Sequence, residues 1–235
     1  MDVRVSIVIP AYNEARRLPA TLTGWNSFLA AQAFDSEVIV ADDGSRDRTA
    51  EVAQRDGARV VRLALNQGKG AAVRAGVLSA SGDVIAYVDA DMNIAPPHLL
   101  HALDLLRAGA DLVVGRRDLS EYAAAEGPIR LLAGGLVQVS RRLLVLSSIA
   151  DTQCGFKVFG RELAQAIFSQ TRINSFAFDI EVLSIATRRH ARIVELPVTT
   201  TYRGESTFHV RRHLAPFLRD IAQIRLNAIA GRYES

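Results

Sequence analysis

Two carboxylates that stand two residues apart, Asp89 and Asp91, are the sharpest chemical feature of the sequence. They follow the apolar run VIAYV, which predicts a buried strand, and Asn93 continues the alternation with another oxygen ligand. Carboxylate oxygens suit Mg²⁺ or Mn²⁺, which proteins usually bind together with substrate phosphates. We therefore predict a divalent-cation site at Asp91, Asp89 and Asn93, in which one carboxylate holds the metal and the other a ribose or a water. The alternative is a solvated turn with capping acids.

A second acidic pair, Asp42 and Asp43, follows another apolar run. An aspartate at such a position can accept a hydrogen bond from a uracil or guanine N–H, and Gly44 lets the backbone turn tightly against the base. The alternative is an ordinary strand-to-helix loop with a capping acid, which would need only one of the two acids.

A glycine-rich segment at 66–70, with the sequence NQGKG, opens a predicted helix. Its glycines allow a close approach of the backbone, and Lys69 beside a helix N-terminus attracts phosphate. The spacing matches neither a Walker P-loop nor the dinucleotide-binding pattern GxGxxG, which argues against an ATPase and a nicotinamide dehydrogenase. The alternative is a glycine-rich turn with a chance lysine.

The overall composition is that of an ordinary globular protein. Of 235 residues, 49% are apolar and 23% are charged, and a net charge of +3 is too small to indicate nucleic-acid binding. The single cysteine, Cys154, excludes an internal disulfide and a cysteine-based zinc site. Residues 1–10 lack a signal-peptide pattern, and no apolar stretch in 128–150 approaches the ~20 residues that span a bilayer. We expect the protein in the cytoplasm, free or resting on the cytoplasmic face of a membrane.

Strand and helix patterns alternate through the first half of the chain. The expected strands are 3–9, 37–41, 58–63, 83–88 and 111–115, and the expected helices are 15–33, 48–56, 69–80 and 97–108. This rhythm predicts a mostly parallel, doubly wound α/β sheet with helices on both faces. Ligands bind such sheets at the carboxyl ends of the strands, so the three polar segments should lie close together.

The pattern beyond residue 120 is less regular. The expected elements are helices at 128–149, 161–169, 179–190 and 209–230, a loop and short strand at 151–159, and a strand at 192–201. We interpret 1–235 as a single domain, in which 1–117 binds a nucleotide sugar and 118–235 binds the acceptor.

Four motifs in this order resemble family 2 glycosyltransferases of the GT-A fold. They are PAYNE at 10–14, DDGSRDRT at 42–49, NQGKG at 66–70 and DAD at 89–91. The resemblance covers about residues 3–117 and implies a mostly parallel sheet flanked by helices. It also implies a nucleotide diphosphate sugar as donor and Mg²⁺ or Mn²⁺ as cofactor.

Motifs in the second half of the chain resemble particular branches of this family. DTQCGFK at 151–157 and FDIE at 178–181 resemble the dolichyl-phosphate glucosyltransferase branch. RGES at 203–206 resembles a loop near the donor pyrophosphate in polyprenyl-phosphate mannose synthases, with Thr207 where a lysine commonly follows.

The resemblance implies a role for each matching residue. Asp42 or Asp43 would read the base, and Asp89 and Asp91 would serve the ribose and the metal. The residues expected to take part in catalysis are Asp89, Asp91, Asp151 and Lys157. Those expected to bind substrate are Pro10, Tyr12, Glu14, Asp42, Asp43, Gly68, Lys69, Arg116, Arg117, Asp179, Arg203 and Ser206.

The resulting hypothesis is an inverting transfer of a hexose from a nucleotide diphosphate sugar to a polyprenyl phosphate. Similarity to the glucosyltransferase branch favours UDP-glucose, with GDP-mannose as the alternative. A phosphate acceptor is already ionised near neutral pH, whereas a hydroxyl acceptor needs a general base, for which Asp151 and Asp179 are the candidates. A glycosyltransferase with a soluble hydroxyl acceptor and a non-catalytic nucleotide-sugar-binding protein are the competing hypotheses.

The last predicted helix bears on contact with lipid. Leu214, Phe217, Ile221, Ile224 and Ala228 recur at spacings of three and four, and most of the arginines lie off this stripe. Such a helix can make a peripheral contact with an anionic membrane, or it can pack on the sheet with a solvated basic face. We expect any companion membrane protein to be encoded separately, and no nucleic-acid partner.

Overall fold

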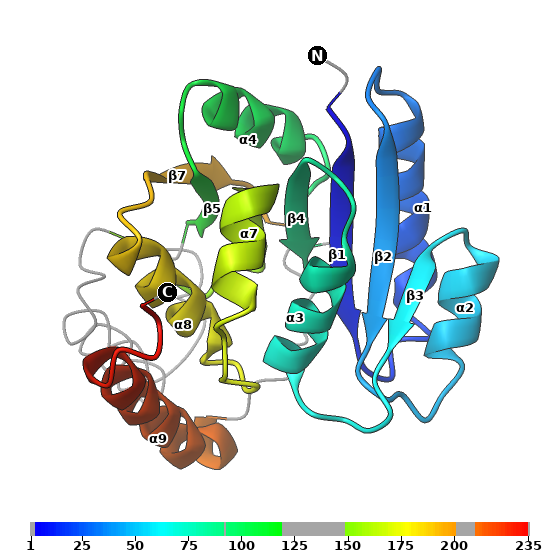
Figure 1. Cartoon of the computed structure of the whole chain (residues 1–235). Coiled ribbons are helices and arrows are strands. Elements are labelled where there is room, and N and C mark those ends of the chain that lie inside the picture. The colour runs from blue at the N-terminus through cyan, green and yellow to red at the C-terminus, as the bar shows by residue number, and fades with distance from the viewer. Residues whose placement is uncertain (1–2, 92, 119–148, 201–209, 235) are drawn as a thin grey trace.

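One seven-stranded sheet organises the chain (Figure 1). The computed structural model describes residues 3–91, 93–118, 149–200 and 210–234. For residues 210–214 it describes the backbone but not the side chains. The strands are β1 Val5–Ala11, β2 Ser36–Asp42, β3 Arg59–Arg62, β4 Val84–Val88, β5 Leu112–Arg117, β6 Phe156–Gly160 and β7 Ile193–Val198. The helices are α1 Leu18–Ala30, α2 Thr49–Arg55, α3 Lys69–Ser79, α4 His98–Arg107, α7 Arg161–Phe168, α8 Phe178–Arg188 and α9 Val210–Ile229.

The strand order is β3-β2-β1-β4-β6-β5-β7. In this sheet β6 runs antiparallel to both β4 and β5, and the other neighbouring pairs are parallel. The predicted class, a mostly parallel α/β sheet, is therefore confirmed. The sheet includes strands from both halves of the chain, so one layer supports the motifs that lie within the described residues.

Helices cover both faces of the sheet, because side chains alternate between the faces along each strand. On one face Val8 and Tyr87 belong to a buried cluster that includes residues of α3, α7, α8 and α9. On the other face Ile7 and Ile9 pack with residues of α1, α2 and α4, among them Trp25. In Figure 1, α3 and α7 lie in front of the strands and α1 lies behind them. The doubly wound arrangement is thus confirmed.

The first strand continues past the predicted boundary at Ile9. The prediction ended there because Pro10 has no N–H for a strand ladder. In the structure Pro10 pairs with Ala41 of β2, whereas the pairing between β1 and β4 ends at Val8. Pro10 therefore has a strand neighbour on one side only, an edge-like position that tolerates a residue without an N–H.

Most other predicted elements differ from the structure only at their ends. The helix predicted at 15–33 spans Leu18–Ala30, with its proline in the first turn, and the strand predicted at 192–201 spans Ile193–Val198. Asp47 lies just before α2, and its Oδ1 accepts a hydrogen bond at 3.0 Å from the N–H of Thr49, the first residue of the helix. The helix predicted at 128–149 falls outside the described residues.

The placement of β6 is the feature that the sequence did not reveal. β6 lies between β4 and β5, although the chain passes from β4 through α4 to β5 first. Lys157 of β6 pairs with Tyr87 on one side and with Val114 on the other. Because β6 is antiparallel, the segment 151–155 that precedes it lies at the edge where β4 and β5 end.

The apolar stripe predicted on the last helix belongs to the core. Phe217, Ile221, Ile224 and Ala228 of α9 lie in the same buried cluster as residues of α8, and the Leu214 side chain is outside the description. The interpretation of this stripe as packing is confirmed. The protein itself covers this stripe, so a membrane contact of α9 through the stripe is excluded, and a contact through its outer face stays a prediction. No helix in the described residues is long and apolar enough to cross a membrane.

Glu37 of β2 ties three strands together at the end of the sheet opposite Asp89. Its Oε1 accepts hydrogen bonds from Ser6 Oγ of β1 at 2.7 Å and from Ser81 Oγ, just before β4, at 2.6 Å. Burial acts to raise the pKa of Glu37, but the hydrogen bonds from Ser81 and Ser6 outweigh it and lower the pKa to about 2. This network fixes the relative positions of β1, β2 and β4.

The stabilising effect of Glu37 should therefore depend on pH. A carboxyl whose pKa is lower in the folded state stabilises the protein above its unfolded pKa, and this contribution is lost as the pH falls through about 4.5 towards 2. Urea unfolding should show that wild type exceeds Glu37→Gln in free energy of unfolding at about pH 6, and that the gap narrows at about pH 3. Glu51→Gln, at an exposed position of α2, is the control. A gap of equal size at both pH values would contradict the network.

Candidate active site

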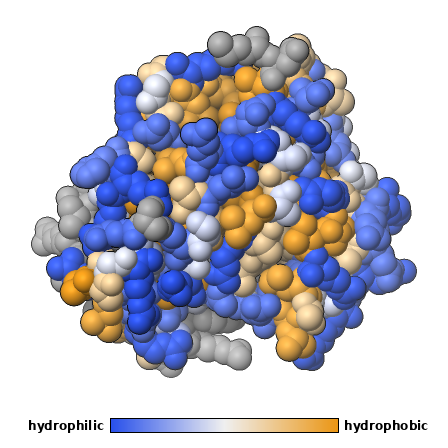
Figure 2. Space-filling model, viewed as in Figure 1, coloured by the Kyte–Doolittle hydropathy of each residue, from blue (hydrophilic) through white to orange (hydrophobic). Residues whose placement is uncertain are grey.

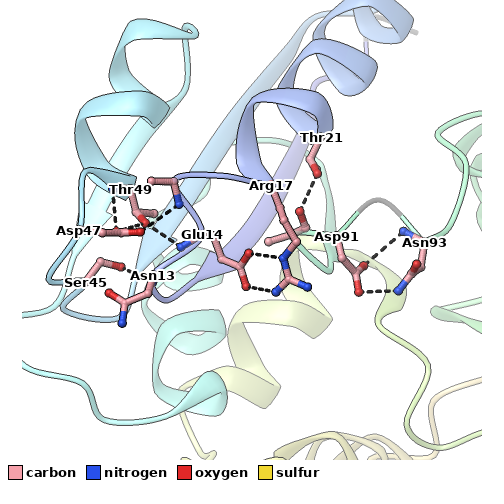
Figure 3. A network of polar contacts seen from close by, with 11 residues as sticks. Asn13, Glu14, Arg17, Thr21, Ser45, Asp47, Thr49, Asp91 and Asn93 are labelled. Atoms are coloured by element: carbon pink, nitrogen blue, oxygen red, sulfur yellow. Dashed lines mark hydrogen bonds and ion pairs between the residues drawn. The ribbon is translucent and has the colours of Figure 1, made fainter. Parts of the chain in front are cut away.

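The loops that leave β1 and β2 are hydrogen-bonded to each other at the carboxyl end of the sheet (Figure 3). The N–H of Asn13 donates to Ser45 Oγ at 2.9 Å, and the N–H of Glu14 donates to Thr49 Oγ1 at 2.8 Å. Tyr12 lies beside them and is 40% exposed. The structure thus brings together the PAYNE and DDGSRDRT motifs, as the parallel sheet predicted.

Asp42, the first acid after β2, is buried and supports its own loop. It accepts the N–H of Ser45 at 3.0 Å, and its other oxygen lies 3.0 Å from Arg62 Nε. The same Oδ2 makes no hydrogen bond within the described residues and the side chain is fully buried, so a base-reading role for this carboxylate stays a prediction.

Asp43 connects this loop to the glycine-rich turn. Its two oxygens accept the N–H groups of Gln67 and Gly68, each at 2.8 Å. Burial raises the pKa of Asp43, and these two hydrogen bonds oppose the rise. Gly44 packs so closely against Leu65 that a Cβ would overlap its backbone, and its φ of +68° suits glycine. The sequence predicted the tight turn at Gly44, but not the bond from Asp43 to the next motif.

Lys69 is the first residue of α3, and its Nζ lies 2.5 Å from Asp89 Oδ1 at the end of β4. Burial acts to lower the pKa of Lys69, but the charges of Asp89 and Asp179 outweigh it and raise the pKa. Burial acts to raise the pKa of Asp89, but the ammonium group of Lys69 outweighs it and lowers the pKa. Both groups are therefore charged near neutral pH, and both remain partly exposed at the sheet edge.

Asp91 and Asn93 lie beside each other (Figure 3), and the charges of Asp89 and Lys69 act on Asp91. The side-chain amide of Asn93 donates to Asp91 Oδ2, and Asn93 Oδ1 is buried without a hydrogen-bond partner in the described structure. Burial and the nearby charge of Asp89 raise the pKa of Asp91. Within the described residues no three His, Cys, Asp or Glu side chains form a metal-binding group. Two carboxylates and an unpartnered amide oxygen nevertheless fit a hard cation that also takes ligands from a substrate.

Arg17 is a charged residue at this site that the sequence analysis did not single out. Its guanidinium donates to both oxygens of Glu14, with Nε–Oε2 at 2.7 Å and Nη2–Oε1 at 2.5 Å, and lies on the side facing Asp91 in Figure 3. The charge of Arg17 acts to lower the pKa of Asp91. The spacing of three residues between Glu14 and Arg17 at the start of a predicted helix could have indicated this ion pair.

The segment before β6 contacts Asp89 directly. The N–H of Asp89 donates to the carbonyl of Gly155 at 3.2 Å, and a Cβ at residue 155 would overlap the Asp89 carboxylate. Glycine is therefore required here for close approach to a charged side chain. This contact explains why the segment DTQCGFK belongs to the site although it is distant in sequence.

The ends of β5 and of the segment before β6 are joined by an ion pair. Arg117 Nε and Nη2 donate to Asp151 at 2.7 and 3.0 Å. Burial acts to raise the pKa of Asp151, but Arg117 outweighs it and lowers the pKa, which makes the carboxylate a weaker proton acceptor. Arg116 is exposed, and Arg203 and Ser206 lie outside the described residues. The environment of Asp151 thus favours an ion pair over the general base considered from the sequence.

Comparison with known proteins identifies the family. The family model described as glycosyl transferase family 2 matches residues 6–168. The chain belongs to glycosyl transferase family 2. The glycosyltransferase is 30% identical to a dolichyl-phosphate beta-glucosyltransferase of Dictyostelium discoideum, an alignment that covers 98% of this chain and 76% of the relative. It is 34% identical to the human dolichyl-phosphate beta-glucosyltransferase, covering 98% of this chain and 77% of the relative.

Solved structures confirm the GT-A fold of the glycosyltransferase. Glucosyl-3-phosphoglycerate synthase from Mycobacterium tuberculosis, in complex with Mn²⁺, UDP and glucosyl-3-phosphoglycerate, superposes with a TM-score of 0.72 at 24% identity. The match covers 96% of this chain and 79% of that chain. A complex of the same synthase with UDP alone also gives a TM-score of 0.72 at 24% identity, covering 98% of this chain and 80% of that chain.

Lys157 of the glycosyltransferase lies beneath the site rather than on its surface. It is 0% exposed, and its Nζ donates to Asp179 Oδ1 at 2.5 Å and to the carbonyl of Cys154 at 2.9 Å. Tyr87 OH donates to the same oxygen of Asp179 at 2.5 Å. The expected catalytic role of Lys157 stays a prediction, because in this structure the ammonium group is buried and bonded to Asp179.

Two further polar groups of the segment before β6 lack partners. Thr152 is 1% exposed, and its Oγ1 is buried without a hydrogen bond within the described residues; the same holds for Gln153 Nε2. Buried polar atoms are usually paired, so these two atoms, unpaired within the described residues, stand out in the segment that contacts Asp89 and Arg117. The motif DTQCGFK contained both residues, but its pattern alone did not show which of them were unpaired.

The ion pair between Lys157 and Asp179 should contribute strongly to stability. Lys157→Met leaves a buried carboxylate without its cation and should lower the free energy of unfolding by about 3–5 kcal/mol. The double variant Lys157→Met with Asp179→Asn should recover part of this loss, because it no longer buries an unpaired charge. Denaturant unfolding of the two single variants and of the double variant measures the free energy of unfolding. If the loss in the double variant equals the sum of the two single losses, these groups do not interact.

Proposed function

We propose that this glycosyltransferase moves glucose from UDP-glucose to a polyprenyl phosphate, with inversion at the anomeric carbon. The observation that carries the proposal is the convergence of Lys69, Asp89 and Asp91 at the carboxyl end of one sheet. The choice of acceptor rests on the similarity to dolichyl-phosphate beta-glucosyltransferases over 98% of the chain. GDP-mannose is the alternative donor.

The donor pyrophosphate would lie against the start of α3. The helix N-terminus offers backbone N–H groups and a favourable dipole, and Lys69 adds a full positive charge that opposes the charge of the leaving nucleotide. Tyr12, which is exposed at the end of β1, would contact the base. Asp43 would read the base only by exchanging the bonds that it now makes to the glycine-rich turn, whereas Asp42 Oδ2 makes no hydrogen bond within the described residues.

A Mg²⁺ or Mn²⁺ ion would be held by Asp91, Asp89 and Asn93. When bound, such an ion neutralises the negative charge that develops on the leaving nucleoside diphosphate. Asn93 supplies a buried oxygen with no partner inside the described structure, and Lys69 keeps Asp89 ionised. Gly155 admits the Asp89 carboxylate and so fixes its position at the end of β4.

The acceptor phosphate would need cations rather than a base, because it is already ionised. Arg116 is exposed at the end of β5, and Arg117 is held beside it by Asp151. Thr152 Oγ1 and Gln153 Nε2 are unpaired donors that can bind oxygen atoms of the sugar or of the phosphate. The lowered pKa of Asp151 agrees with an acceptor that does not require proton removal.

Transfer from radiolabelled UDP-glucose to polyprenyl phosphate, followed by extraction into organic solvent, tests this proposal. Wild type with Mg²⁺ or Mn²⁺ should give lipid-soluble product, and Asp91→Ala should reduce the rate at least about 100-fold, the size expected when a group that stabilises transition-state charge is lost. Asp104→Ala, an exposed acid on α4, is the control.

Activity that survives both a chelator and Asp91→Ala would exclude the proposed cation site. Water-soluble product would favour a hydroxyl acceptor, and tight UDP binding without turnover would favour a non-catalytic binding protein. GDP-mannose in place of UDP-glucose decides between the two donors.

A peripheral membrane contact would use the outer face of α9. Leu218, Leu226 and Ile229 are 46%, 59% and 70% exposed, and Arg219 and Arg225 are exposed on the same helix. Apolar atoms lie among charged ones over α9 at the lower left of Figure 2. Exposed aliphatic side chains with flanking arginines match the surface of an anionic membrane, where a polyprenyl phosphate resides.

Vesicle flotation measures this contact. The protein should float with phosphatidylglycerol vesicles more strongly than with phosphatidylcholine vesicles, and Leu226→Glu combined with Ile229→Glu should abolish the difference, because two carboxylates replace apolar surface. Leu78→Glu, an exposed leucine on α3, is the matched control. Equal flotation of both variants would exclude the outer face of α9 as the membrane contact.

A further inference from the structure

The glycine-rich turn before α3 is packed against the backbone of another loop. The N–H of Gly70 donates to the carbonyl of Asn174 at 2.8 Å. A Cβ at Gly68 would overlap this carbonyl, and a Cβ at Gly70 would overlap the carbonyl of Ile173. The position of Lys69, between the two glycines, therefore depends on the loop 170–177 that joins α7 to α8.

Arg74 makes a second connection between α3 and this loop. Its guanidinium donates to the carbonyl of Thr171 at 3.1 Å and to Asn174 Oδ1 at 2.9 Å. Backbone and side-chain bonds thus fix the loop against the start of α3 at several points. Movement of the loop would carry the turn with it.

A buried carboxylate on α8 holds the loop from its other side. Glu181 is 0% exposed, and its oxygens accept the N–H of Arg172 at 2.9 and 3.0 Å and the N–H of Ile173 at 2.8 Å. Tyr233 OH donates to Glu181 Oε1 at 2.6 Å. Tyr233 is 1% exposed, so the C-terminal segment inserts its ring into the core and its hydroxyl into this network.

Residues of α9 fix the other side of the tyrosine hydroxyl and the far end of the loop. Asn227 Nδ2 donates to Tyr233 OH at 3.1 Å. Ser175 Oγ donates to Asp220 Oδ2 at 2.6 Å. The last helix and the residues after it therefore hold the loop at two separate points. None of these groups reaches the sheet edge that carries Asp89.

We propose that Tyr233 and Glu181 form a C-terminal latch that positions the turn at 68–70 for the diphosphate of the nucleotide sugar. The path runs from the Tyr233 hydroxyl through the Glu181 carboxylate to the loop 170–177, and from there to Gly70. Tyr233 is a positioning residue in this scheme, because it touches no substrate. The inference relies on the proposed function only for the identity of the ligand.

Tyr233→Phe tests the latch because it keeps the ring in the core and removes only the hydroxyl. The matched control is Ser6→Ala, which removes a hydroxyl that donates to a glutamate, Glu37, at the opposite end of the sheet. Both variants lose a buried bond to a carboxylate and should lose stability. Only Tyr233→Phe should affect the turn.

Amide hydrogen exchange of residues 66–72 is the first measurement, and it needs no ligand. Tyr233→Phe should speed exchange of the Gly70 amide about five-fold, whereas Ser6→Ala should not change it. Ser175→Ala, which releases the loop from α9, should speed it as well. Unchanged exchange in both loop variants would overturn the latch, whether or not the chain proves to be a glycosyltransferase.

Binding of UDP with Mn²⁺ and steady-state kinetics with UDP-glucose are the second measurement. Tyr233→Phe should weaken UDP binding and raise the donor KM about five-fold, with the acceptor KM unchanged, whereas Ser6→Ala should change neither. A donor KM equal to that of wild type would reduce Tyr233 to a structural role and overturn the proposal. Wild type that binds no nucleotide would refute the proposed function, and the exchange measurement would still decide the latch.

Discussion

The contact between Lys69 and Asp89 is the constraint on which the site depends. A lysine in the first turn of a helix faces the positive end of the helix dipole, where a cation is unfavourable. Asp89 offsets this repulsion from the end of β4, and each charge keeps the other ionised. In the proposed function the donor diphosphate would meet a lysine that already has a partner, so this ion pair would have to loosen when the nucleotide sugar binds.

Contacts made by several other elements fix the positions of Lys69 and Asp89. Asp43 bonds the loop after β2 to the glycine-rich turn, and Gly155 lets the chain before β6 approach the Asp89 carboxylate. Glu37 joins three strands at the opposite end of the sheet, and Lys157 with Asp179 fills the space beneath. Most polar groups around the site are thus occupied by the protein itself. The buried site atoms that make no hydrogen bond within the described residues are Asp42 Oδ2, Asn93 Oδ1, Thr152 Oγ1 and Gln153 Nε2.

The first half of the fold could be predicted from the sequence, because apolar runs, prolines and glycines mark each strand and helix locally. The meeting of Glu14, Ser45 and Asp91 followed from the rule that parallel strands end at one edge. The position of β6 did not follow, since no local pattern shows where a strand from the second half enters the sheet. The roles of Asp43 and Lys157 were also hidden, because burial and bonding partners depend on tertiary contacts. The resemblance to known motifs identified the segment DTQCGFK at 151–157 as part of the site, but it did not show the geometry of that segment.

The ion pair between Arg117 and Asp151 joins two points of the chain that lie at the same edge of the sheet, at the end of β5 and before β6. These residues are 34 apart in sequence, so the bond closes a long loop of chain. The entropic cost of closing a loop rises by only about 0.6 kcal/mol when the length of the loop doubles. The stability of the strands that carry the carboxylates therefore depends little on how many residues separate Arg117 from Asp151.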